Sequence, residues 1–420
     1  MKISALIIAF LATLIQCYDY ALFGLSAAQL AKNFMPHHHE TEQLLHFFTI
    51  FSIAVIARPL GSIIFGMIGD NYGRVNSVKI AAGIAAISTG CIGLMPGFEI
   101  IGWCATILLT ICRMTFLMSL AGEIDATRIY VAEKIGVKHR NLANGIVSFY
   151  SQIGALLAAT SYHMTANAEI TDLWRINFII GGVAGALIIL MRRYFQESDE
   201  FLNFKAKTQD HRGLDSEIIT LIKAHKLQFF LSILINGCNG GIYHFLIIFF
   251  ATFASKIAYI INSTQAQFAN ICFIATYAIA SVLSGFIADK FSAKKQIITA
   301  LTVSIIIITI IIILSGFGIT DSTLYIIMLL VGLLPFYVVP LQIIIQSMFS
   351  IGIKMRMCSL SHSIGSMLLS STTPFFCMLL WKYTGSITII FSFLLTLIAI
   401  LLGAVTFCYS TALIAANKSP

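Results

Sequence analysis

Long runs of apolar residues, separated by short polar segments, fill most of the chain. The hydrocarbon core of a bilayer is about 30 Å thick, so a helix that crosses it needs roughly 20 mainly apolar residues. Twelve runs reach that length, at approximately residues 4–30, 44–68, 77–95, 101–126, 142–164, 175–194, 227–254, 267–287, 297–316, 323–348, 357–380 and 387–411. The pattern predicts an all-α integral membrane protein with twelve transmembrane helices.

The longest polar stretch runs from about Gln196 to Lys226 and carries charges of both signs. It leaves six apolar runs before it and six after it. We therefore expect an N-terminal six-helix half over residues 1–195 and a C-terminal six-helix half over residues 227–420. Residues 196–226 would form a cytoplasmic linker with some amphipathic helix.

One short glycine-rich and charged motif occurs at the same place in each half. The first copy, between runs two and three, holds Gly66, Gly69, Asp70, Gly73 and Arg74. The second copy, between runs eight and nine, holds Gly285, Asp289 and Lys290. A recurrence across a six-plus-six division indicates internal duplication, which is a known plan of membrane transporters.

Composition agrees with a lipid environment. Only 10% of the residues are charged and 58% are hydrophobic, whereas soluble domains carry roughly a quarter charged residues. The formal net charge of +8 does not indicate nucleic-acid binding, because the basic residues lie in short loops between apolar runs.

The distribution of basic residues predicts the orientation in the membrane. With a cytoplasmic N-terminus, twenty Lys and Arg residues face the cytoplasm and four face outward. The four are Lys32, Arg175, Lys256 and Lys382. Cytoplasmic loops carry an excess of Lys and Arg, so we expect both termini on the cytoplasmic side.

The sequence offers little for metal, cofactor or enzymatic chemistry. Nine cysteines lie singly without a CxxC pair, so neither a disulfide framework nor a zinc site is indicated. The segment His37–Glu40 is interpreted as a solvated loop because consecutive residues rarely form a closed metal site. No Walker loop is present and no Ser–His–Asp set can be assembled, so we expect neither a cofactor nor an enzyme.

An ordered set of motifs along the chain carries a resemblance to a known family. The set consists of the two loop motifs, Tyr18-Asp19-Tyr20, Arg58-Pro59, Arg113, Gly122-Glu123, Trp174-Arg175, Arg356 and Thr372-Thr373-Pro374. It resembles the major facilitator superfamily, and within it the metabolite–proton symporter group, which carries proline and betaine, citrate, ketoglutarate and shikimate. The chain departs from that pattern at Phe116-Leu117, Gln346-Ser347 and Ser292-Ala293, which leaves the substrate open.

The resemblance implies the major facilitator fold, a monomeric unit in a bacterial inner membrane, and protons as coupling ion. It also implies alternating access, in which a site between the halves opens to one side at a time. The residues Gly66, Asp70, Gly73, Arg74 and Asp289 of the loop motifs then have a conformational role, together with Arg356.

Asp19 and Arg113 are the leading candidates for proton coupling. Ionisable groups inside a bilayer are expensive, so they mark functional positions by default. A rise of 1.5 Å per residue places Asp19 roughly 20 Å above the inner edge and Arg113 some 15 Å below the outer edge. The two are therefore expected to meet, with protonation of Asp19 releasing Arg113 to a substrate carboxylate. The alternative is a structural ion pair, and the resemblance adds Glu123 to the coupling or gating residues.

Other polar residues are candidate substrate contacts. Arg58 lies nearer the cytoplasmic mouth and either guides an anionic group or pairs with an acid, while Asp125 and Arg128 are spaced to pair on one helix face. In the second half the candidates are Asn236, Asn239, Tyr243, His244 and His362. Tyr18 is added as an aromatic contact for a quaternary ammonium group. For each of them, hydrogen bonding between helices is the alternative role.

The function predicted from these residues is proton-coupled uptake of a small zwitterion or organic carboxylate. An exporter of a small metabolite or metal-chelating acid is the main alternative, because a sequence does not give the direction of net flux. A non-transporting membrane sensor is less favoured, because it would need a larger soluble module than the linker. The expected partners are a small solute, protons and the lipid bilayer.

Overall fold

The computed structural model describes residues 2–36, 39–72, 74–121, 123–135, 137–166, 172–191, 220, 222–315, 321–349 and 354–410. This part of the chain consists of helices and contains no strand, as the apolar pattern predicts. Many large apolar side chains are exposed along the outside of the helices, among them Ile87, Leu94, Ile100 and Met164. Lipid is the solvent that such a surface fits.

The helices before the expected linker are α1 (Lys2–Leu25), α2 (Ala27–Phe34), α3 (Glu40–Ala54), α4 (Ala57–Tyr72), α5 (Arg74–Leu94), α6 (Phe98–Ile101), α7 (Trp103–Leu120), α8 (Glu123–Ile135), the 3₁₀ turn η1 (Val137–His139), α9 (Arg140–Ala166) and α10 (Trp174–Met191). Those after it are α13 (Lys226–Tyr243), η3 (His244–Phe249), α14 (Phe250–Thr252), η4 (Phe253–Ile257), α15 (Ser263–Lys290), α16 (Ala293–Ser315), α17 (Asp321–Ser347), α18 (Lys354–Gly365), η5 (Ser366–Ser370), α19 (Thr373–Thr384) and α20 (Ile387–Ser410). We call the two groups the first half and the second half.

Within the described residues, nine helical segments are long and apolar enough to cross a membrane, and a bent pair would make ten. Two shorter apolar helices, Lys79–Leu94 and Trp174–Leu187, lie where the sequence predicts spans three and six. The first predicted span is not one straight helix, because α2 bends away from α1 by 62°. The bend allows α2 to bury Ala27, Leu30 and Phe34, and α2 packs against α3.

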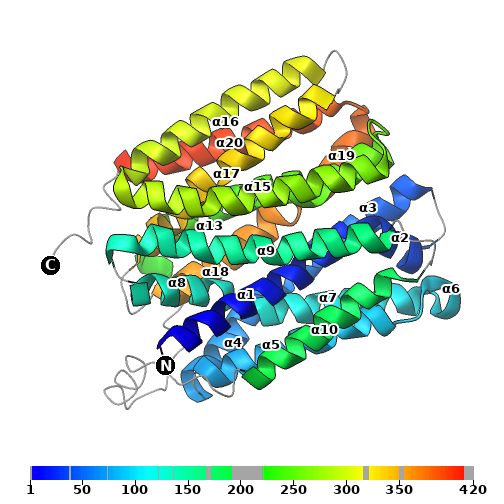
Figure 1. Cartoon of the computed structure of the whole chain (residues 1–420), viewed down its shortest axis with the longest axis horizontal. Coiled ribbons are helices and arrows are strands. Elements are labelled where there is room, and N and C mark those ends of the chain that lie inside the picture. Colours follow the sequence, from blue (N-terminus) through cyan, green and yellow to red (C-terminus); the bar gives the residue numbers. More distant parts are fainter. Residues whose placement is uncertain are drawn as a thin grey trace.

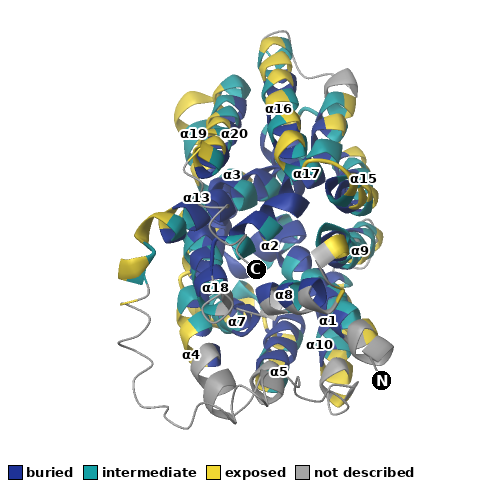
Figure 2. Cartoon of the chain, turned by 90° about the vertical axis from the view of Figure 1, so that its left-hand side faces the viewer, coloured by how far each residue is buried: buried dark blue, intermediate teal, exposed yellow. Residues whose placement is uncertain are grey.

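The helices form one bundle with their long axes roughly side by side (Figure 1). The start of α1 and the end of α20 lie at the same end, on the left of Figure 1, which we call the terminus end. The opposite end, where α3 begins and α19 ends, is called the far end. Seen from the terminus end, buried residues gather in the middle of the bundle and exposed ones lie around its outside (Figure 2).

The two halves meet along α9 and α15, which pack closely over their length, and α9 also packs against α1. Contacts between the halves occur at both ends. At the far end Lys256 pairs with Glu40 at 3.5 Å, and the rings of Phe48 and Phe249 lie 5.6 Å apart.

Local irregularities interrupt the helices at the interface between the halves. Three segments, η3, η4 and η5, are π-helical, a form that is frequent at functional sites. The segments η3 and η5 meet where Oγ of Ser370 lies 2.9 Å from Nδ1 of His244. The segment η5 also lies close to α13, because a Cβ on Gly240 would overlap the side chain of Ser370. In the first half, α7 and α8 are separate helices because Ala121 has extended backbone angles, so predicted span four is broken.

Candidate functional site

Arg113 on α7 lies at the centre of the bundle with only 2% of its surface exposed. Its guanidinium carbon lies 4.2 Å from the ring centre of Phe23, 5.0 Å from Tyr20, 5.1 Å from Phe116 and 5.5 Å from Phe51. Aromatic faces attract cations, and the attraction increases when the pair is removed from water. These four rings, which we call the aromatic cage, stabilise a buried positive charge.

Among the described residues, Arg113 has few hydrogen-bond partners. A guanidinium has five N–H donors. The contact found is from Nη2 to the Tyr20 carbonyl at 3.5 Å, and Nε has no hydrogen-bond partner among the described residues. A buried guanidinium with vacant donors is suited to bind a carboxylate, which accepts two parallel hydrogen bonds from it.

Asp19 is also buried, with 4% of its surface exposed, but it does not form the predicted ion pair with Arg113. Its carboxylate points to α10, where a Cβ on Gly181 would overlap Oδ1, and Oδ1 has no hydrogen-bond partner among the described residues. Successive residues on a helix point about 100° apart. Tyr20 therefore faces Arg113 and Asp19 faces away from it.

A hydrogen-bonded bridge joins the halves beside the aromatic cage. The hydroxyl of Tyr20 lies 2.6 Å from Nε2 of His244, the first residue of η3. Nδ1 of His244 lies 2.7 Å from the Gly240 carbonyl and 2.9 Å from Oγ of Ser370. The bridge links α1 to the π-helical segments η3 and η5 and leads to the Tyr20 ring that covers Arg113.

The other predicted substrate contacts are dispersed. Tyr243 donates to Oε1 of Gln152 on α9 at 3.3 Å, so it also reaches across the interface. Asn236 donates to Ser232 on its own helix at 3.4 Å, and Oδ1 of Asn239 has no partner among the described residues.

Tyr18 is held inside the first half. Its hydroxyl donates to the Asn177 carbonyl at 3.0 Å and lies 3.4 Å from Oγ of Ser161. Its side chain therefore lies away from the aromatic cage.

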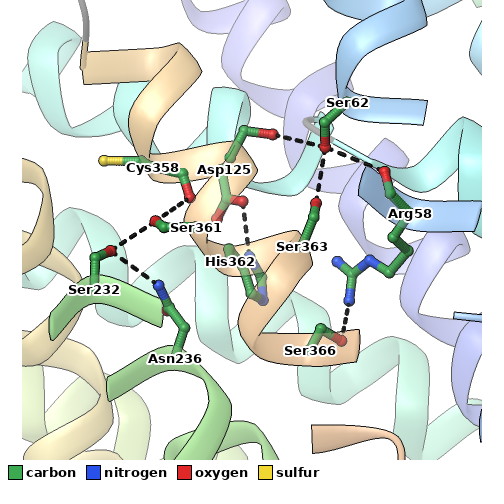
Figure 3. A network of polar contacts seen from close by, with 11 residues as sticks. Arg58, Ser62, Asp125, Ser232, Asn236, Cys358, Ser361, His362, Ser363 and Ser366 are labelled. Carbon is green, nitrogen blue, oxygen red and sulfur yellow. Dashed lines mark hydrogen bonds and ion pairs between the residues drawn. The ribbon is translucent and has the colours of Figure 1, made fainter. Parts of the chain in front are cut away.

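Nearer the terminus end, α4 and α8 of the first half contact α18 and η5 of the second half through polar side chains (Figure 3). Nη1 of Arg58 donates to Ser366 at 2.8 Å, and the hydroxyls of Ser62 and Ser363 lie 2.8 Å apart. Nδ1 of His362 lies 2.7 Å from Oδ2 of Asp125.

We call these three contacts the polar band. The predicted partner of Asp125 was Arg128, but the carboxylate instead bonds His362, because α8 presents it to the other half. Arg58 likewise takes a hydroxyl partner, and its Nε has none among the described residues.

A second contact between the halves at the terminus end involves Asp289, the last acidic residue of α15. Its carboxylate accepts from the backbone N–H of Asn141 at 3.1 Å and of Leu142 at 2.8 Å, and from the Asn141 amide at 2.9 Å. Vacant N–H groups at a helix N-terminus favour an anion. Asp289 therefore caps α9 across the interface.

Several predicted gating and coupling residues lie outside the described part. Gly73 and the linker residues 196–219 are not described, nor are the surroundings of Gly66 or the side chains of Asp70, Arg74 and Glu123. Arg356 is described and is half-buried in the first turns of α18.

The sequence reasoning missed the neutral partners of the charged residues. Ser363, Ser366 and Ser370 make contacts across or beside the interface, and Gln152 accepts from Tyr243. A signal was available, because serine is unusually frequent in the eleventh apolar run, at positions 359, 361, 363, 366, 370 and 371. Among the described residues, no group of three or more His, Cys, Asp or Glu is placed to hold a metal ion.

Comparison with known proteins gives a family match in the first half. A family model described as "Sugar (and other) transporter" matches residues 5–221. The proline/betaine transporter of Escherichia coli (strain K12) is 33% identical over 217 residues, which is 50% of this chain and 43% of that protein. The chain thus matches less than half the length of this relative. A putative proline/betaine transporter of Staphylococcus haemolyticus (strain JCSC1435) is 27% identical over 382 residues, 88% of this chain and 80% of that protein.

Solved structures match almost the whole fold. The partially occluded, inward-open xylose transporter XylE from E. coli covers 97% of each chain with a TM-score of 0.75 and 17% identity. The human organic anion transporter MFSD10 covers 96% of this chain and 99% of its own with a TM-score of 0.68 and 15% identity. The fold is therefore that of these carriers.

Proposed function

Since the chain belongs to the sugar (and other) transporter family of the major facilitator superfamily, we propose that it takes up a small zwitterion or organic carboxylate together with protons. Proline-like or betaine-like solutes are the first candidates, because the relatives that match it are named proline/betaine transporters. Di- and tricarboxylates follow. The proposal concerns a membrane transporter and not an enzyme.

The observation that carries the proposal is the buried guanidinium of Arg113. Its Nε has no hydrogen-bond partner among the described residues and Nη2 reaches the Tyr20 carbonyl at 3.5 Å, so several donors remain for a ligand. An isolated buried charge is expensive unless it is paired. A solute carboxylate would supply the missing partner, and the bridge from Tyr20 to His244 would convey its binding to the second half.

Alternating access requires contacts that can break at either end of the bundle. The polar band and the cap by Asp289 are such contacts at the terminus end, and the Lys256–Glu40 pair is one at the far end. We propose that these contacts are the gates. In this view Gly66, Asp70, Gly73, Arg74, Asp289 and Arg356 have conformational roles.

We propose twelve transmembrane spans in a bacterial inner membrane and a monomeric functional unit. The two short apolar helices and the bent pair support this number together with the nine longer segments. The excess of basic residues at the terminus end supports a cytoplasmic location for it.

The test is uptake into proteoliposomes of radiolabelled proline, glycine betaine, citrate, 2-oxoglutarate and shikimate, with and without an inwardly directed proton gradient. We expect gradient-driven accumulation of at least one solute. Arg113→Gln should lower kcat/KM for that solute by roughly 100-fold, the order expected for loss of a charged hydrogen-bonded partner. Lys32→Gln, which changes an exposed residue of α2, is the matched control and should transport normally.

Asp19→Asn tests the coupling role proposed for Asp19. Accumulation that follows the proton gradient should be lost, while exchange of labelled for unlabelled solute should continue. Accumulation that survives this substitution would remove Asp19 from the coupling role. Loss of solute from loaded vesicles under an inward proton gradient would instead favour the exporter.

A further inference from the structure

A cleft lies between the two halves at the far end of the bundle, near the end of α9 and the start of α15 (Figure 1). The first half lines it from α1, α2 and α9, and the second half lines it from α14, η4 and α15. Its inner part has a volume of about 30 Å³ and adjoins an outer part of about 480 Å³. The two parts share Ser255, Lys256 and Ser263. Neither Arg113 nor a residue of the polar band is among the described residues that line this cleft.

A buried carbonyl in the inner part of the cleft lacks a donor. Oδ1 of Asn270 on α15 has no hydrogen-bond partner among the described residues, and only 3% of the surface of Asn270 is exposed. A buried acceptor that is left without a donor is destabilising. The neighbouring amide of Gln267 is instead held from the first half, with Oε1 at 2.9 Å from Nδ1 of His163. Asn270 therefore offers its carbonyl to an N–H or O–H group that enters the cleft.

A positively charged side chain lies where the two parts of the cleft meet. Lys256 belongs to η4, which is π-helical. Its Nζ lies 3.5 Å from Oε1 of Glu40 on α3, and the two side chains are 38% and 44% exposed. Ion pairs with this much exposure to solvent are weak. Another carboxylate can therefore replace that of Glu40 with little loss of free energy.

We propose that the cleft is a loading site for a small zwitterion, whose carboxylate displaces Glu40 from Lys256 and whose N–H group donates to Oδ1 of Asn270. The choice of solute rests on the proposed function, whereas the site rests on the geometry of the cleft. Much of the remaining lining is small and apolar, as at Ala159 and Ala251, which suits a short apolar body such as the proline ring.

Displacement of Glu40 would link solute binding to opening of the far end. The pair of Lys256 and Glu40 joins η4 of the second half to α3 of the first half. A solute carboxylate on Lys256 removes this connection, so the solute favours the state in which the far end is open. The site also selects among solutes, because a fully methylated ammonium group has no N–H to donate to Asn270.

The test is chemical labelling of the intact protein in nanodiscs with a membrane-impermeant maleimide at position 263, after Ser263→Cys. The unsubstituted protein gives the background from exposed native cysteines such as Cys91 and Cys104. Proline is the probe, and N,N-dimethylproline, which has no N–H group, is its matched analogue. Each measurement is made with and without Arg113→Gln, which separates binding in the cleft from binding beside Arg113.

Proline should slow labelling at position 263 with and without Arg113→Gln. It should act at a concentration at least tenfold lower than N,N-dimethylproline, the order expected for a hydrogen bond to a charged group. Asn270→Leu keeps the approximate size of the side chain but removes the carbonyl, so this preference should disappear. Asn33→Leu, at an asparagine outside the cleft whose amide donates to the Gln29 carbonyl, is the control and should keep the preference.

Substitutions in the ion pair should have opposite effects on the proline concentration that gives half-maximal protection. Glu40→Gln frees Lys256, so this concentration should fall at least threefold. Lys256→Gln removes the charge that binds the carboxylate, so it should rise at least tenfold. A pair that only held the halves together would shift both values in the same direction. Asp172→Asn, which breaks another exposed pair, is the matched control and should leave the value unchanged.

Three results would each overturn the proposal. They are labelling that proline does not slow, a preference for proline that survives Asn270→Leu, and shifts of the same sign in Glu40→Gln and Lys256→Gln. If the protein takes up no solute but proline still protects position 263, the proposed function fails and the binding site stands. If uptake occurs without protection, the loading site fails and the proposed function stands.

Discussion

At the scale of single side chains, the aromatic cage explains how Arg113 is buried without a carboxylate beside it. Four rings surround the guanidinium at 4.2 to 5.5 Å, which replaces part of the hydration that the charge loses. The same rings offer few acceptors, so the donors stay available. The aromatic cage therefore stabilises the buried guanidinium of Arg113 when no solute is bound, and it also leaves N–H donors available for an anion.

Phe23→Leu should destabilise the protein by more than removal of an aromatic ring alone would. Phe23 is the closest ring to Arg113, at 4.2 Å, and a desolvated cation–π contact is worth about 2 kcal/mol. Phe47→Leu is the control, because Phe47 is equally buried and stacks on Phe23 at 5.2 Å. Thermal unfolding in detergent should show the larger loss for Phe23→Leu, and equal losses would argue against the cage.

At this scale the sequence predicts two buried ionisable side chains, Asp19 and Arg113, but not the direction in which each of them points. The apolar runs indicate that Asp19 and Arg113 lie inside the membrane, and both side chains are buried in the bundle. Their heights along the membrane normal follow from the helix rise. The rotation of α1 about its axis does not follow from the rise, and it turns Tyr20 rather than Asp19 toward Arg113.

At the scale of elements, the π-helical segments η3 and η5 shape the interface. Each contains one wider turn, which brings His244 and Ser370 within 2.9 Å of each other. Hydrophobicity does not distinguish such a turn from ordinary helix, so the sequence predicts the spans but not these irregularities. The broken span at Ala121 was missed for the same reason, and it is this break that starts the helix carrying Asp125.

Gly240→Ala should push α13 and the π-helical segment η5 apart. Its new Cβ would lie 2.7 Å from Cβ of Ser370 and closer still to the hydroxyl, and overpacking of this kind costs about 1–3 kcal/mol. The double variant Gly240→Ala with Ser370→Gly should recover most of the loss in thermal stability. Gly403→Ala, at a position with no atom within 4 Å of the added Cβ, is the control and should be harmless.

At the scale of the whole molecule, the two halves are joined by contacts at both ends and by the long packing of α9 against α15. The division into halves was predicted from the polar stretch and the repeated motif. The role of Asp289 as a cap on α9 of the other half was not, because it depends on how the halves are docked. The relative position of the two halves cannot be predicted from a single sequence.

Asp289→Asn should loosen the terminus end without unfolding either half. An amide accepts fewer hydrogen bonds than a carboxylate and loses the charge that complements the start of α9, at a cost of about 1 kcal/mol. Hydrogen exchange should accelerate in the first turns of α9 and remain unchanged at the far end. Asp172→Asn, a largely exposed residue paired with Arg175, is the control. Equal exchange in the two variants would contradict the capping role.

Two of the three contacts in the polar band end on serine hydroxyls, and such weak contacts make the terminus end easier to open. Hydrogen bonds between membrane helices average about 0.6 kcal/mol, so the three contacts of the band together hold roughly 2 kcal/mol. Since 1.4 kcal/mol is a tenfold change in population, the three contacts by themselves change the ratio of closed to open molecules by only about thirtyfold. A band of strong ion pairs would leave the open form too rare to carry solute. The short hydroxyl side chains thus keep the free-energy difference between the closed and open forms of the terminus end small.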